Sequence, residues 1–195
     1  MDSLTNVMIA TLLCFLTMVP PSTATTTSPL NVTLIQSACN ETVDHEFCLN
    51  HLSKNPLVVS ASQGPSPLAI AAAIAESGLA DAEEMHKYAA NKVARSPAVK
   101  TAYAECAGLL DGTTLQLRVA VNILKQRAAL TEMGASDDAS ESLLTSIDGV
   151  AGCMDTLDSV KVEDQYVKTS CKEVMVYSVA ANSILRQLKY NITGK

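Results

Sequence analysis

Four long stretches of the chain repeat their apolar residues at steps of three and four, which is the spacing of one face of an α-helix. They run over residues 68–93, 99–124, 143–157 and 167–188. The last stretch alternates four and three strictly, a pattern typical of the seam of a helical bundle. Aromatic residues make up only 4% of the chain, which favours close helix packing over a β-sandwich. The sequence therefore predicts an all-α fold, an up-down-up-down four-helix bundle.

The segment ahead of the bundle predicts two short helices. They would occupy residues 30–54 and meet at a turn near Asp44. Residues 55–67 contain three Pro, one Gly and several Ser, so we expect a linker there. Residues 131–138, with a Gly, a Ser and two Asp, predict a loop before the third bundle helix.

The N-terminal residues 1–24 predict a signal peptide. An apolar run from Val7 to Val19 is followed by small residues. That run is about thirteen residues long, shorter than the ~20 that a membrane-spanning helix needs. A stable membrane anchor is therefore the less favoured alternative, and residues 25–195 are predicted to be secreted to the extracellular space.

Three Asn-x-Thr triplets agree with export. They make Asn31, Asn40 and Asn191 possible N-glycosylation sites. Each triplet alone is weak support, because such triplets also occur by chance.

Five cysteines remain once the predicted signal peptide is removed, so one must be unpaired. Cys39 and Cys48 are nine positions apart and form the local pair. Cys171 lies on the apolar seam of the last stretch, where a free thiol behaves as a small hydrophobe, and this leaves Cys106 to pair with Cys153. Spacing alone leaves open that Cys171 is paired and that Cys106 or Cys153 is free.

Catalytic and nucleic-acid-binding patterns are absent from the sequence. The formal net charge is -6 and the Lys and Arg residues are scattered, which argues against a nucleic-acid partner. The three His do not form a His-Glu-x-x-His motif, and no glycine-rich phosphate loop occurs. We therefore expect no catalytic residue, no metal and no cofactor, and a protein that acts by binding another protein.

Three spacings carry a resemblance to a known family. They are Ile35-x-x-x-Cys39 with eight residues before Cys48, Ala102-x-x-x-Cys106 at the start of a long helix, and Leu143-Leu144 with eight residues before Cys153-x-Asp155. Over nearly the whole mature chain the sequence resembles the plant invertase and pectin methylesterase inhibitor family. The resemblance implies a secreted four-helix bundle with an N-terminal helical hairpin. It also implies two disulfides, Cys39–Cys48 and Cys106–Cys153, with Cys171 free.

The resemblance also suggests a target. Pectin methylesterase inhibitors of this family pack the bundle against the esterase cleft through acidic and polar residues that follow the third and fourth cysteines. Asp111, Thr114 and Asp155 are the corresponding candidate contacts here. Gly108 and Leu110 stand where those inhibitors often carry Glu and an aromatic residue.

Invertase inhibitors of the family insert a Pro-Lys-Phe segment from the loop before the third bundle helix. Residues 131–137 of this chain read Thr-Glu-Met-Gly-Ala-Ser-Asp instead. The predicted function is therefore a secreted inhibitor of a cell-wall carbohydrate-active enzyme, foremost pectin methylesterase. The alternatives are an inhibitor of acid invertase, a non-inhibitory interaction module and, less favoured, a helical lipid carrier.

Overall fold

The structure is a computed structural model that describes residues 29–94, 96–129 and 137–193. Its helices are α2 (Pro29–Cys39), α3 (His45–Leu52), α4 (Pro56–Ser62), α5 (Pro67–Ala90), α6 (Pro97–Ala129), α7 (Asp137–Ser159) and α8 (Gln165–Thr193). The described residues contain no strand, so the predicted all-α class is confirmed. The predicted signal peptide and most of the loop before α7 lie outside the described residues.

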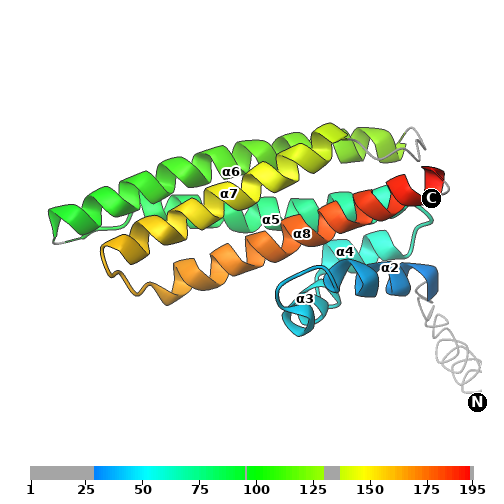
Figure 1. The fold of residues 1–195 in the computed structure, drawn as a ribbon, viewed down its shortest axis with the longest axis horizontal. Helices are drawn as coiled ribbons and strands as arrows, with labels where there is room; N and C mark the ends of the chain where they lie inside the picture. The colour runs from blue at the N-terminus through cyan, green and yellow to red at the C-terminus, as the bar shows by residue number, and fades with distance from the viewer. Residues whose placement is uncertain (1–28, 95, 130–136, 194–195) are drawn as a thin grey trace, which may run out of the picture.

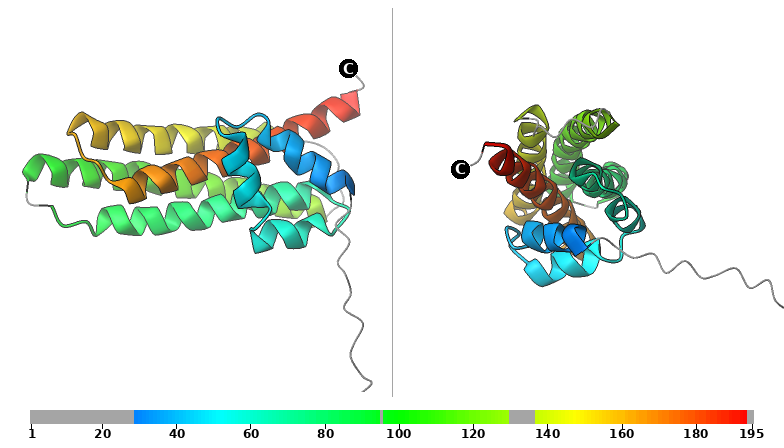
Figure 2. Two further views of the ribbon diagram at one scale, coloured as in Figure 1. Left: turned by 90° about the horizontal axis from the view of Figure 1, so that it is seen from below. Right: turned by 90° about the vertical axis from the view of Figure 1, so that its right-hand side faces the viewer.

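The four long helices form the predicted bundle (Figure 1). Each packs against its neighbours in the chain, and α8 closes the ring by packing against α5. Short connections at residues 91–96 and 160–164 reverse the chain, so consecutive helices are antiparallel. The end-on view in Figure 2 shows the four helices around a common axis, which confirms the up-down-up-down arrangement.

The core is built from aliphatic residues and many alanines. Helix α5 buries a continuous run from Ile70 to Ala75, where small side chains let the neighbouring helices approach closely. Larger side chains from all four helices fill the centre and are fully buried, among them Ile74, Leu110, Leu117, Leu143, Val150 and Ile184. This distribution follows the apolar spacing of the sequence.

The N-terminal helices pack on the outside of the bundle. Helix α2 lies against α8, and α4 lies against α5 (Figure 1). Ion pairs hold the α2–α3 hairpin to α8: Glu41 with Arg186 at 3.0 Å and Asp44 with Lys172 at 2.7 Å. The ring nitrogen Nε2 of His51 also lies 3.2 Å from Oε1 of Glu173. The predicted helical hairpin is confirmed.

The linker predicted over residues 55–67 is wrong in its first half, which forms α4. The Asn55 side chain caps this helix by accepting hydrogen bonds from the backbone amides of Leu57 and Val58, at 3.0 and 3.3 Å. Pro56 occupies the first turn, where its missing N–H costs nothing. Val58 is buried against the rest of the protein, so packing stabilises a helix too short to form alone.

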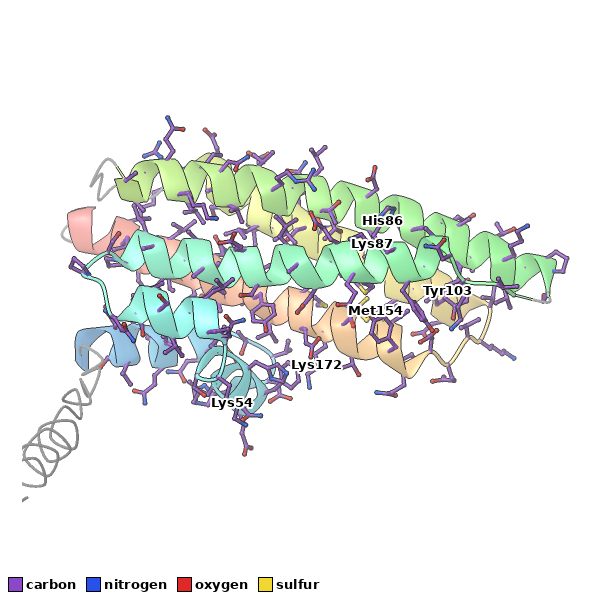
Figure 3. All side chains as sticks on the ribbon, turned by 180° about the vertical axis from the view of Figure 1, so that it is seen from behind. Lys54, His86, Lys87, Tyr103, Met154 and Lys172 are labelled. Atoms are coloured by element: carbon purple, nitrogen blue, oxygen red, sulfur yellow. A yellow bond between two sulfur atoms is a disulfide. The ribbon has the colours of Figure 1, made fainter. Side chains whose placement is uncertain are left out.

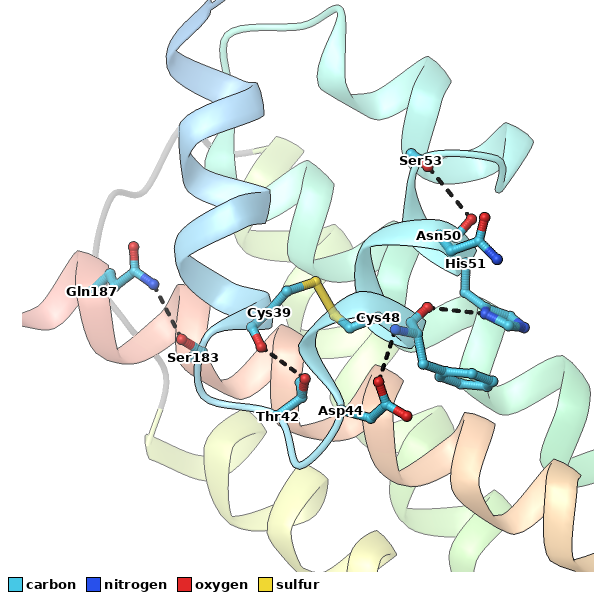
Figure 4. The surroundings of a disulfide bond; sticks show 10 residues. Cys39, Thr42, Asp44, Cys48, Asn50, His51, Ser53, Ser183 and Gln187 are labelled. Atoms are coloured by element: carbon cyan, nitrogen blue, oxygen red, sulfur yellow. Dashed lines mark hydrogen bonds between the residues drawn. A yellow bond between two sulfur atoms is a disulfide. The ribbon is translucent and has the colours of Figure 1, made fainter.

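Two disulfides staple the fold. Cys39 and Cys48 join α2 to α3, and the turn between them is capped by Asp44, which accepts from the amide of Phe47 at 3.0 Å (Figure 4). Cys106 and Cys153 join α6 to α7. Cys171 is unpaired and buried in α8. This is the pairing that the family resemblance implies.

A single carboxylate ties together the end of the bundle where the connections at residues 91–96 and 160–164 lie. Asp164 Oδ2 accepts hydrogen bonds from the hydroxyls of Tyr88 at 2.9 Å and Tyr103 at 2.6 Å, and pairs with Lys92 at 3.1 Å. Although burial opposes ionisation of Asp164, these hydrogen bonds outweigh it and lower the pKa of the carboxyl to about 2. Because Tyr88, Tyr103 and Asp164 come from three different segments, the cluster fixes their relative positions.

Within the described residues, no helix has the combination of length and hydropathy that crossing a membrane requires.

Candidate functional site

Helices α6 and α7 approach each other closely because two glycines of α7 face α6. A Cβ on Gly149 would lie 3.1 Å from the backbone oxygen of Leu109 and would also meet Thr113 Oγ1. A Cβ on Gly152 would lie 3.2 Å from the Leu109 side chain. The Thr113 hydroxyl donates a hydrogen bond to the backbone oxygen of Leu109 at 3.2 Å, and it also lies 3.4 Å from the backbone oxygen of Ser146 as a second acceptor. With the Cys106–Cys153 disulfide, these contacts make the helix pair a closely packed platform.

The outer surface of this platform is the α6–α7 face. Helical spacing places its residues on adjoining strips of the two helices. They are Glu105, Gly108, Leu109, Gly112 and Val119 of α6, and Glu141, Leu144, Asp148, Gly152 and Asp155 of α7. Leu109, Val119 and Leu144 are large apolar side chains exposed to solvent, at 37%, 39% and 49%. Gly108, Gly112 and Gly152 leave the surface between these apolar residues without side-chain atoms.

Helix α7 carries a charge of one sign only. Its sequence contains Asp137, Asp138, Glu141, Asp148, Asp155 and Asp158 and has no Lys or Arg. These six carboxylates equal the formal net charge of the whole chain, -6, so the charges of the remaining residues balance. Lys189 pairs with Asp137 at 2.8 Å and Lys168 pairs with Asp158 at 3.2 Å. The carboxylates in the middle of the helix, Glu141, Asp148 and Asp155, have no ion-pair partner among the described residues.

The structure separates the three contact residues that the sequence predicts. Asp111 is exposed and lies with Thr114 in an open groove of about 370 Å³ between α5 and α6. Asp155 is exposed on α7, whose residues do not line this groove. Thr114 is only 6% exposed, and its hydroxyl donates to the backbone oxygen of Asp111 at 2.8 Å. Asp111 and Asp155 are therefore available to a partner on different strips of the bundle, while Thr114 offers little surface.

Sequence reasoning missed the basic residues of the α5–α6 groove. Its walls also carry His86, Lys87 and Arg118, and Figure 3 labels the first two on α5. Arg118 pairs with Glu83 across the groove at 2.7 Å. The i, i+3 and i+7 spacing of Asp111, Thr114 and Arg118 places them on one strip of α6 and could have identified the arginine.

The two positions that depart from the usual pattern of the family have different surroundings. Gly108 is exposed, and no atom lies within 4 Å of the place a Cβ would take. Leu110 is fully buried in the bundle core, so it cannot touch a partner. Only the departure at Gly108 changes the surface.

The structure divides the predicted glycosylation sites. Asn31 is 2% exposed, and its Nδ2 donates to the backbone oxygens of Ser62 at 2.6 Å and Gly64 at 2.8 Å. A glycan on that nitrogen would replace one of the hydrogens used in these bonds and would disturb this packing. Asn40 is exposed in the turn after α2. The side chain of Asn191 lies outside the described residues.

A second electrostatic cluster lies where α5, α8 and α3 meet. Burial raises the pKa of Asp81 to about 6, and the nearby carboxylates of Glu173 and Glu84 add to this shift, while His51 opposes it. Burial likewise raises the pKa of the Cys171 thiol to about 12, which keeps it protonated. Within the described residues no group of three or more His, Cys, Asp and Glu side chains could hold a metal ion.

Comparison with known proteins agrees with this architecture. One similar solved structure, mutant form A of a pectin methylesterase inhibitor from Arabidopsis, has a TM-score of 0.63 and 20% identity over 78% of this chain and 95% of that one. Another, a pectin methylesterase inhibitor from Arabidopsis thaliana, has a TM-score of 0.53 and 20% identity over 80% and 96%. Identity at this level shows a shared fold. No curated protein matched the chain. A profile of the plant invertase/pectin methylesterase inhibitor family matches residues 33–192, and the chain therefore belongs to that family.

Proposed function

We propose that this protein inhibits a cell-wall pectin methylesterase by covering the substrate cleft of the enzyme with its α6–α7 face. Membership of the family supports an inhibitory role, and both similar solved structures are described as pectin methylesterase inhibitors. The observation that carries the proposal is the α6–α7 face itself. It combines exposed apolar side chains with carboxylates that have no ion-pair partner among the described residues.

The physical properties of this face suit an occluding surface. The disulfide and the close glycine contacts hold α6 and α7 in place before binding, so association costs little conformational entropy. The apolar residues Leu109, Val119 and Leu144 provide area that binding can bury. The unpaired carboxylates of α7 favour a partner with a basic surface and accelerate the encounter at low salt.

The proposal includes export by the predicted signal peptide, residues 1–24, to the apoplast. An inhibitor of a cell-wall enzyme must reach that compartment. The two disulfides agree with an oxidising environment.

A direct assay uses the purified mature protein and measures methanol release from pectin by pectin methylesterase. We expect the rate to fall with added protein. Because an inhibitor in the cleft competes with substrate, the apparent KM should rise while kcat at saturating pectin stays unchanged. Raising the salt concentration from about 50 mM to about 500 mM should slow the association of the protein with the esterase, since salt screens the electrostatic attraction of the α7 carboxylates.

Acid invertase serves as the second target in the same experiment. Its activity should be unaffected, because the chain lacks the Pro-Lys-Phe segment of the invertase inhibitors. Inhibition of invertase alone would replace the proposed target with the alternative one. Full activity of both enzymes at excess protein would reject the inhibitor function for those targets.

A further inference from the structure

The two described sequons lie on the same helix and its adjoining turn, yet they have opposite surroundings. Asn31 is in the first turn of α2, and its side-chain amide nitrogen donates hydrogen bonds to the backbone oxygens of Ser62 and Gly64. Ser62 is the last residue of α4 and Gly64 follows two positions later, so the acceptors are 31 and 33 positions from Asn31 in the sequence. Asn31 is thus a structural donor that ties α2 to the end of α4.

Asn40 is the first residue after α2. Its backbone amide donates to the oxygen of Gln36 at 3.1 Å, and its side chain is exposed. The hydroxyl of Thr42 donates to the backbone oxygen of Cys39 at 2.7 Å, so the third residue of the sequon belongs to the same tight turn (Figure 4). A group attached to Asn40 would project from this turn into solvent.

We propose that Asn40 carries an N-linked glycan and that Asn31 remains unmodified in the folded protein. In the reaction, the Asn40 amide nitrogen attacks the anomeric carbon of a lipid-diphosphate-linked oligosaccharide. The nitrogen–carbon bond forms, the carbon–oxygen bond to the diphosphate breaks, and the lipid diphosphate leaves while the amide loses one proton. The proposal rests on the proposed export, because this donor and its transferase are found in the secretory route, and it is independent of the inhibited enzyme.

The position of Asn40 leaves the proposed binding face free. Helices α2 and α3 lie on the side of the bundle opposite α6 and α7 in the views of Figures 1 and 2. Among the four bundle helices, the one they mainly contact is α8. A glycan at the α2–α3 turn therefore extends away from the α6–α7 face, and its removal should not change inhibition.

The test expresses the full-length chain in a mammalian secretory cell line and recovers it from the medium. Peptide mass spectrometry before and after peptide N-glycosidase treatment in heavy-oxygen water marks each former glycan site. Three variants accompany it. Asn40→Gln removes the acceptor, Thr42→Ser keeps both the sequon and the hydroxyl that donates to Cys39, and Thr33→Ala destroys the first sequon without touching Asn31.

We expect the peptide containing Asn40 to be marked in the unsubstituted protein and in Thr42→Ser, and to be unmarked in Asn40→Gln. Thr33→Ala should leave the glycan content unchanged. An unmarked Asn40 in secreted protein, or a marked Asn31, would overturn the proposal. Retention of the chain in the cells with residues 1–24 still attached would overturn export and this proposal together, while inhibition by the purified protein would still be measurable.

Discussion

Replacing Asp81 with Asn is expected to stabilise the protein at neutral pH and to leave it unchanged in acid. Asp81 is a half-buried residue of α5, and the carboxylates of Glu84 and Glu173 lie near enough to repel its charge. Its pKa is raised from the usual 3.8 to about 6, so the folded protein holds this proton more tightly than the unfolded chain does. Ionising Asp81 therefore weakens the fold.

The magnitude follows from the linkage between protonation and folding. The free energy of unfolding should fall as pH rises from about 4 to about 6, and the loss is complete above that range. A difference of about two in pKa corresponds to about 3 kcal/mol, and the partial solvent access of Asp81 reduces this to about 1–2 kcal/mol. Asn has the same shape and no charge, so Asp81→Asn avoids this loss.

Urea denaturation at pH 7.5 and pH 4.0, followed by circular dichroism, measures the effect. Asp81→Asn should raise the free energy of unfolding at pH 7.5 and leave it within error at pH 4.0. Glu105→Gln, which removes an exposed carboxylate without an ion-pair partner among the described residues, is the matched control and should change neither value. An Asp81→Asn protein that is less stable at pH 7.5, or equally shifted at both pH values, would refute the electrostatic reasoning.

Three further predictions concern other parts of the bundle. Asp164→Asn should lower the free energy of unfolding by about 2 kcal/mol at pH 6, because the lowered pKa of Asp164 stabilises the fold above about pH 4. This stabilisation is lost as the pH falls towards about 2. Urea denaturation of the unsubstituted protein and of Asp164→Asn should therefore give the same free energy of unfolding at that pH. Gly149→Ala should cost about 1–3 kcal/mol in thermal unfolding by forcing α7 away from α6, whereas Gly112→Ala, with open space around its Cβ, should be neutral or add up to about 1 kcal/mol. A thiol reagent at pH 8 should leave Cys171 unmodified in the native protein and react with it in urea, and rapid native reaction would contradict its burial.

Apolar spacing predicted the bundle because each long helix buries one strip of its surface. It failed at α4, whose seven residues are too few to show a period and include Pro and Ser, which usually indicate a loop. Asn55 followed by Pro56 nevertheless indicates the start of a helix, because Asn is a common N-cap residue and Pro is favoured in the first turn. Short helices that depend on packing are therefore the part of this fold that the sequence pattern described least well.

The candidate site could be predicted only in part. Proximity to the bridge cysteines identified Asp111 and Asp155, but the angle of each residue around its helix places them on separate strips. The pairing of Arg118 with Glu83 depends on how α5 and α6 are aligned, which no local pattern reveals. The burial of Asn31 likewise depends on where α4 ends, far along the chain.

The central claim, that the α6–α7 face covers the cleft of pectin methylesterase, is tested most directly by two single-arginine variants. Gly112→Arg places a long charged side chain on the exposed strip of α6 where no atom crowds the Cβ, so the fold should be preserved. Asn50→Arg makes the same change on the exposed side of α3. With pectin methylesterase at fixed concentration, Gly112→Arg should raise the inhibition constant at least about tenfold, about 1.4 kcal/mol, and Asn50→Arg should leave it unchanged. Equal inhibition by both variants, or loss of inhibition in Asn50→Arg alone, would contradict the account.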